Sequence, residues 1–173
     1  AAPAPSVEQA PSPSERSQRV QGARGTSIDT EYQVVELDSL KPADAEFQPR
    51  NRVTDPAGYA AQQQRQFEAF NPGFLGRGAQ ADTGAPIVGP DDKIDSGNGR
   101  RQLLDRVYRE APEKATAYRQ MIEAAGFPTA GLRQPVLIRR RTTAMTAEQR
   151  ASWASEANET VMQALDADER ARM

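Results

Sequence analysis

The chain of 173 residues contains no cysteine and no histidine. Without cysteine it forms no disulfide, no cysteine-zinc site and no thiol nucleophile. Without histidine it lacks the usual general base and the most common metal ligand. These two absences exclude catalysis by a thiol or a histidine and metal sites made of cysteine or histidine.

Excess charge of one sign and long apolar stretches are also lacking. The formal net charge is −2 and the isoelectric point is near 5.3, so no overall basic field attracts nucleic acid, and any DNA contact must come from a local patch. The sequence has no run of about 18 apolar residues to span a membrane, and the apolar segment of a signal peptide is missing. We therefore expect no membrane association and no export through a signal peptide in this segment.

The chain begins with a stretch rich in alanine, proline, serine and glutamine that has no apolar periodicity. Such a composition does not bury enough apolar surface to order a chain. We predict a disordered linker over residues 1–29 and one folded domain over residues 30–173, which is long enough for a single core. The chain opens at Ala1, and residues 166–173 have the pattern of a helix start. We therefore expect it to be a fragment of a longer protein with other domains.

Strands and helices are predicted to alternate along the domain. Strand patterns occur at 31–37, 86–88 and 134–140, with a short strand residue at Ile94. Helix patterns run from 56 to 70, from the glycine loop at 97–99 to 110, from 113 to 125, and after Thr146, which opens a capping box with Gln149. Residues 74–83 are predicted to form a loop, and Trp153 is expected in the core. This order predicts an α+β fold, a small mixed sheet with several helices packed around it.

One segment carries the strongest functional signal. Residues 84–104, GAPIVGPDDKIDSGNGRRQLL, form an apolar strand, a polar turn and a glycine-bracketed loop that leads directly into a helix. Backbone N–H groups freed by the glycines can point at an anion, and the helix N-terminus adds about half a positive charge. An arginine in the first turn can donate two hydrogen bonds to one phosphate. We interpret this loop as a phosphate- or nucleotide-binding site made by Gly97, Asn98, Gly99, Arg100 and Arg101; the alternative is a structural turn with surface arginines beside it.

Other basic residues are candidates for binding negative charge. Arg50 and Arg52, in the sequence QPRNR, could reach the same site from the side of the first strand, or they are ordinary surface arginines. Arg139, Arg140 and Arg141 could contact a nucleic-acid backbone. Alternatively, this basic strand end is a solvated edge that blocks pairing with other sheets.

A short acidic and amide-bearing stretch is the candidate metal site. Glu156, Asn158 and Glu159 offer the oxygen ligands that Mg²⁺ prefers. On an unrelated helix the same residues would simply form its solvated face.

The glycine loop resembles the GxxR box of the ParB/sulfiredoxin superfamily, in which a PIxV strand is followed by GERR or GxGR and a helix. Residues 97–100 fall on the four positions of that box. Residues 34–50, VVELDSLKPADAEFQPR, resemble the family's opening strand and QPR turn, and residues 153–171 resemble its AEN segment, with Asn158 on the asparagine. The sequence of residues 84–100 is similar to that of the DdrB-like ParB domain of large polyvalent phage and mobile-element proteins, which is linked to defence against restriction.

The resemblance implies a ParB N-terminal-like fold and a nucleotide-binding module that uses a nucleoside triphosphate and Mg²⁺. It implies a weak Mg-dependent NTPase or phosphotransferase associated with DNA or anti-restriction, with Asn158 helping to place nucleotide and metal. The implied partners are a nucleotide, DNA and other domains of a longer polypeptide, and the implied location is the cytoplasm or a virion. Two alternatives stay open: a metal-dependent DNA nuclease that holds its cation on Glu156, Glu159 or Asp95, and a non-catalytic virion or protein-interaction domain.

Three positions depart from the patterns of better-known members of the superfamily. Asn98 stands where CTP-hydrolysing ParB clamps have glutamate, and Val161 stands where they have arginine. A ParB-type CTP switch is therefore not implied. Gly99 stands where sulfiredoxins have their cysteine, which excludes sulfiredoxin chemistry. No catalytic residue is predicted.

Overall fold

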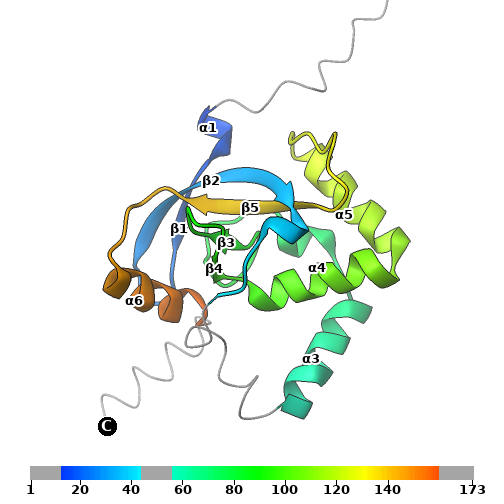
Figure 1. Cartoon of the computed structure of the whole chain (residues 1–173), viewed down its shortest axis with the longest axis horizontal. Coiled ribbons are helices and arrows are strands. Elements are labelled where there is room, and N and C mark those ends of the chain that lie inside the picture. The colour runs from blue at the N-terminus through cyan, green and yellow to red at the C-terminus, as the bar shows by residue number, and fades with distance from the viewer. Residues whose placement is uncertain (1–12, 44–55, 160–173) are drawn as a thin grey trace, which may run out of the picture.

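The computed structural model describes residues 13–43 and 56–159, and its centre is a five-stranded mixed sheet (Figure 1). The strands are β1 (Ser17–Gln21), β2 (Ser27–Glu36), β3 (Ile87–Val88), β4 (Ile94–Ser96) and β5 (Pro135–Arg141). Their order across the sheet is β1-β2-β5-β3-β4. The last strand in the sequence, β5, therefore lies in the middle of the sheet.

The strand pairing is antiparallel except at one position. β1 pairs with β2, β2 with β5, and β3 with β4, all antiparallel, whereas β3 and β5 are parallel. A parallel pair needs a long crossover connection. Helices α4 (Asn98–Glu110) and α5 (Pro112–Ala124) lie between these two strands in the sequence and belong to that connection.

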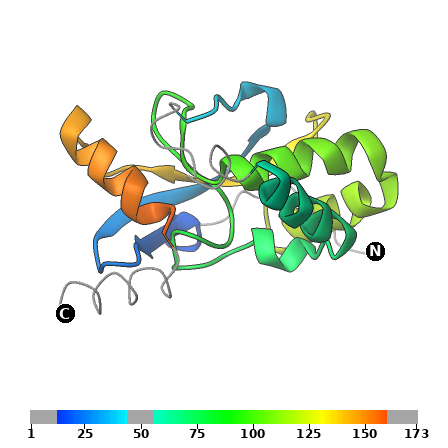
Figure 2. The ribbon, with the colours of Figure 1, turned by 90° about the horizontal axis from the view of Figure 1, so that it is seen from below.

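The other helices precede, connect and follow the strands along the chain. They are α1 (Pro13–Arg16), α3 (Pro56–Glu68) and α6 (Ala147–Ala157), with short 3₁₀ helices η1 (Leu37–Ser39) and η3 (Pro72–Leu75). In two perpendicular views α6 lies at one end, and α3, α4 and α5 gather at the other (Figures 1 and 2). Within the described residues no helix is long and apolar enough to span a bilayer.

Two clusters of buried apolar side chains hold these elements together. The larger one packs α4 and α5 on the sheet through residues such as Leu104, Ile122 and Ile138. The smaller one joins Trp153 of α6 to β1 and β2, where it meets Val20. Trp153 is only 2% exposed, which confirms its predicted place in the core.

The predicted fold class is confirmed, and so are most predicted elements. The structure is α+β with a small mixed sheet. Helix α4 begins directly at the glycine loop, and Thr146 and Gln149 form the predicted capping box at the start of α6. These agreements arise because apolar spacing and capping groups act within a few residues of one another.

The predicted N-terminal boundary needs a correction. Residues 13–29, which the sequence placed in a disordered linker, form α1, β1 and the beginning of β2. Their composition is polar, but Val20 and Ile28 pair across the two strands and are fully buried against α6. The ordered domain therefore begins upstream of residue 30. Residues 1–12 of the predicted linker lie outside the described part of the chain.

Candidate anion-binding site

The glycine loop brings a helix N-terminus directly after strand β4. Gly97 precedes α4 with φ +120°, and a Cβ there would lie 2.8 Å from Cβ of Pro86, so only glycine fits. Gly99 is different because it lies inside the helix. A Cβ at Gly99 would approach Nε2 of Gln63 on α3 to 3.2 Å. Both glycines thus allow close packing, but only Gly97 uses the left-handed backbone region.

The first turn of α4 leaves backbone donors without acceptors. The N–H groups of Asn98, Gly99 and Arg100 precede the first intrahelical bond, which runs from the N–H of Arg101 to the carbonyl of Gly97. Gly97 has no side chain to cap them, and no acceptor for them is found among the described residues. Such a helix end attracts an anion through both its N–H groups and its dipole.

Asn98 and Arg101 lie three residues apart, on one face of α4. Asn98 is buried, and its Oδ1 accepts a hydrogen bond from the backbone N–H of Ala43 at 3.1 Å. Arg101 is half-buried, its Nε is fully buried, and it has no hydrogen-bond or ion-pair partner within the described residues. Arg101 therefore carries a guanidinium charge without a partner among the described residues, in the same first turn of α4 as the uncapped N–H groups.

Arg100, by contrast, does not face this helix end. Its guanidinium donates to the carbonyl oxygens of Gly84 at 2.8 Å and Ala81 at 3.1 Å, and to Oγ of Ser96 at 2.7 Å. Burial, and then the like charge of Arg139, lower the pKa of Arg100 to about 9. The expectation that Arg100 completes a phosphate cradle does not fit this arrangement, because its donors already hold the loop before β3.

The three consecutive arginines of β5 also form hydrogen bonds and ion pairs within the domain. Arg139 is completely buried, and its guanidinium donates to backbone carbonyls that include those of Gly78 and Ala85. Burial lowers the pKa of Arg139 to about 10. Arg141 is buried in an ion pair with Asp95 at 2.8 Å.

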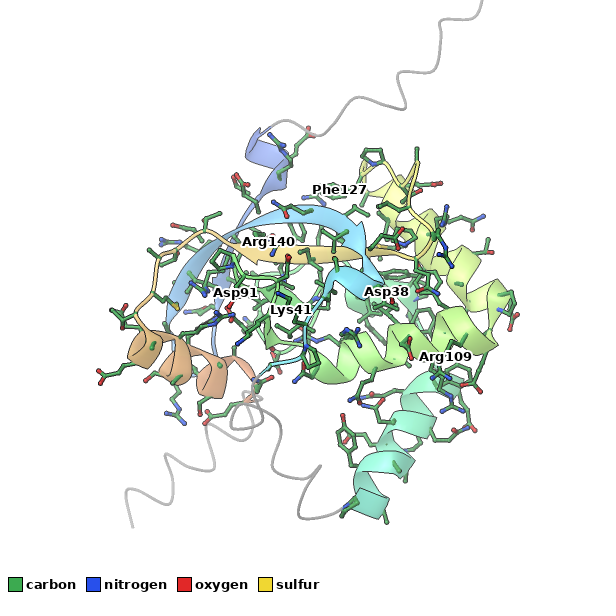
Figure 3. The ribbon with its side chains drawn as sticks, viewed as in Figure 1. Asp38, Lys41, Asp91, Arg109, Phe127 and Arg140 are labelled. Carbon is green, nitrogen blue, oxygen red and sulfur yellow. The ribbon has the colours of Figure 1, made fainter. Side chains whose placement is uncertain are left out.

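Arg140 is the middle one of the three consecutive arginines of β5. It is partly buried, and it pairs with Asp92 at 2.8 Å in the turn between β3 and β4. Figure 3 shows Arg140 on the central strand. A nucleic-acid contact by residues 139–141 conflicts with this burial. The expected solvated strand edge is also corrected, because β5 is a central strand and both its neighbours are occupied.

The residues predicted to bind a metal ion serve another purpose. The carboxylate of Glu156 accepts hydrogen bonds from the backbone N–H groups of Arg24 and Thr26, and from Oγ1 of Thr26. Glu159 forms an ion pair with Arg24, and Nδ2 of Asn158 donates to the carbonyl of Asp95. These three side chains fasten the end of α6 to the β1–β2 turn and to β4.

Asp95, the further carboxylate considered for a nuclease, is fully buried between two arginines. It pairs with Arg141 and, at 2.9 Å, with Arg150. Within the described residues no group of three or more acidic side chains is arranged to hold a metal ion. The predicted contributions of Arg50 and Arg52 lie outside the described residues.

A cavity of about 760 Å³ beside α4 was not predicted from the sequence. Its walls come from α3, the η3 region, residues 82–84 and α4, and include Arg65, Phe70, Phe74 and Arg100. The sequence gives only a weak indication of this cavity. Phe74 lies in a glycine-rich stretch without periodicity, and its 72% exposure is evident only in the folded chain.

The fold and this site define a class of protein: a small α+β domain in which a strand pair leads through a glycine turn to an uncapped helix N-terminus. The chain matches the model of the ddrB-like ParB superfamily domain over residues 23–142. It therefore belongs to that superfamily. Comparisons with curated proteins and with solved structures give no significant match. The family match begins at the β1–β2 turn and ends after β5, so the resemblance proposed for residues 153–171 lies outside it.

Proposed function

We propose that this ParB-like domain binds the phosphate groups of a nucleotide at the N-terminus of α4. One observation carries the proposal: the N–H groups of Asn98, Gly99 and Arg100 have no acceptor among the described residues, and the unpartnered Arg101 lies in the next position. Three backbone donors and one guanidinium match the several acceptor oxygens of a phosphate chain.

The geometry supports binding of a nucleotide better than its hydrolysis or the transfer of its phosphate. The carboxylates that could act beside a phosphate, Asp95 and Glu156, are buried and bonded within the domain. Mg²⁺ usually reaches nucleotide sites on the phosphate oxygens and keeps several waters, so a dedicated cage of protein ligands is not required. We therefore propose a nucleoside triphosphate with Mg²⁺ as the ligand, and assign no catalytic residue.

The test is the affinity of the domain for ATP, GTP, CTP and UTP with Mg²⁺, measured by isothermal titration calorimetry. Arg101→Gln is expected to weaken binding of the preferred nucleotide by roughly 10- to 100-fold, because a charge-assisted hydrogen bond is lost. Arg109→Gln is the matched control, since Arg109 lies on the same helix, exposed and paired with Asp105 (Figure 3). Equal affinity of Arg101→Gln and wild type would reject the site.

The same preparation tests the nuclease alternative. If the domain nicks plasmid DNA with Mg²⁺ and without nucleotide, and Arg101→Gln stops the nicking, the loop holds a DNA phosphate instead. If no nucleotide binds and no DNA is cut, a non-catalytic interaction domain replaces both proposals.

A further inference from the structure

The cavity between α3 and α4 has the properties of a second ligand site, separate from the N-terminus of α4. Its volume of about 760 Å³ lies within the range of small-molecule pockets. Apolar side chains supply much of the wall, among them Phe70, Leu75 and Leu103. Residues 97–99 and Arg101 are not part of its described lining.

Phe74 gives the cavity an apolar rim. It is 72% exposed, and it is the one large hydrophobic side chain of the described residues that is so exposed. A solitary exposed phenylalanine at the edge of a cavity offers a flat surface on which an apolar ligand can stack.

The charges around the cavity are unbalanced. Among its described lining residues three are arginines, Arg65, Arg77 and Arg100, and one is an acid, Asp82. Arg77 is already engaged, because it donates to backbone carbonyls and lies 5.0 Å from the ring centroid of Tyr32. Arg65 is exposed on α3 and has no ion pair or side-chain hydrogen bond to any described residue.

A further positive charge lies directly behind the cavity wall. Nη2 of Arg139 is 3.6 Å from the place that a Cβ would occupy at Gly84, which is itself a lining residue. Arg139 and Arg100 both bind neutral oxygens, and within the described residues neither forms an ion pair. The carboxylate of Asp82, also a lining residue, attracts both guanidinium groups electrostatically but forms no ion pair with either of them within the described residues. Two buried positive charges that share one unpaired carboxylate are costly, and a bound anion would offset part of that cost.

From these features we infer that the cavity binds a small organic carboxylate with an apolar, preferably aromatic, body. The body would lie among the apolar walls and against Phe74, and the carboxylate would face Arg65 and the field of the buried arginines. A triphosphate fits this cavity poorly, because its many charged oxygens would meet a largely apolar wall.

The probes are indole-3-propionate, 3-phenylpropionate and hexanoate, each compared with its primary amide, which has nearly the same shape and no charge. Binding to the domain is followed by calorimetry and by thermal shift. We expect at least one carboxylate to bind about 10-fold or more tightly than its amide. We expect Arg65→Gln and Phe74→Ser each to weaken that carboxylate about 5-fold or more, with Arg109→Gln equal to wild type.

Two further measurements separate this site from the proposed nucleotide site. Arg101→Gln is expected to bind the carboxylate as wild type does, and ATP with Mg²⁺ is expected not to displace it. The inference is overturned if no carboxylate binds up to about 10 mM, if the amides bind equally well, if Arg65→Gln and Phe74→Ser have no effect, or if ATP competes. Each of these results can occur whether or not the N-terminus of α4 binds nucleotide.

Discussion

Arg100 and Arg101 are neighbours in the sequence, but their side chains have opposite surroundings. Arg100 donates to carbonyls of residues 81–85 and to Ser96, so it holds the loop that precedes β3. Arg101 has no partner among the described residues. A helix turns by about 100° for each residue, so consecutive side chains meet different parts of the fold. At the scale of single residues, one arginine is structural and the other is the candidate for ligand binding.

This difference predicts a large effect on stability at Arg100 and almost none at Arg101. Arg100→Gln is expected to lower the free energy of unfolding by about 2–3 kcal/mol, because buried carbonyl oxygens lose their donor; relief from the like charge of Arg139 offsets part of the loss. Arg101→Gln is expected to change it by no more than about 0.5 kcal/mol. Urea denaturation near neutral pH measures both. Equal losses for the two variants would contradict these assignments.

The hairpin of β1 and β2 is ordered although the apolar pattern of its sequence is weak. β1 has one fully buried side chain, Val20, which packs in the cluster of Ile28 and Trp153. Glu156 of α6 binds the backbone of the turn that joins the two strands. An edge strand with so little apolar surface is stabilised by an element that lies far away in the sequence.

Removal of β1 is therefore expected to destabilise the domain. A chain that starts at Gly22 should melt about 5 °C or more below a chain that starts at Pro13, because the first lacks Val20 and the β1–β2 ladder. Differential scanning calorimetry of the two chains makes the comparison. Equal melting temperatures would show that β1 contributes little to the stability of the domain.

Ion pairs join α6 to β4 and the β3–β4 turn, at the opposite edge of the sheet from β1. Arg150 of α6 binds Asp91, in the β3–β4 turn, and the buried Asp95. The hydrogen bond from Arg150 is the main cause that lowers the pKa of Asp91 to about 2, from an ordinary value of 3.8. The N–H of Arg133 is the main cause that lowers the pKa of Glu36. A carboxyl whose pKa is lower in the folded state stabilises the fold above its unfolded pKa and loses that contribution in acid.

The pH dependence of stability tests this link. Near neutral pH, Asp91→Asn is expected to melt below wild type, and the difference should shrink as pH falls from about 4 towards 2, where Asp91 becomes protonated in the folded state too. The effect should be modest, because the Asp91 side chain is 43% exposed and solvent screens the pair. Asp38→Asn is the control variant, as Asp38 is exposed and has no ion pair with the described residues. A difference that stays constant down to about pH 2 would contradict the role of Asp91.

Patterns within short stretches of the sequence are sufficient to locate most helices and strands and to indicate the family. Apolar spacing located α4 and α5, Thr146 and Gln149 marked the start of α6, and the glycine loop marked the start of α4. The same loop led to the superfamily that the family match confirms. These signals act between residues that are a few positions apart, so they are present in the sequence before the chain folds.

Which charged side chains are available for function depends on how distant segments of the chain pack together. Arg139 and Arg141 look like a basic strand end in the sequence, but β5 pairs on both sides and both arginines are buried. Glu156 looks like a metal ligand, but the turn that it caps lies about 130 residues away. Burial and pairing of this kind depend on contacts between distant segments, and the composition of one segment does not contain them. Arg101 is the leading candidate for ligand binding because the side chain of the neighbouring Arg100 is already bonded within the fold.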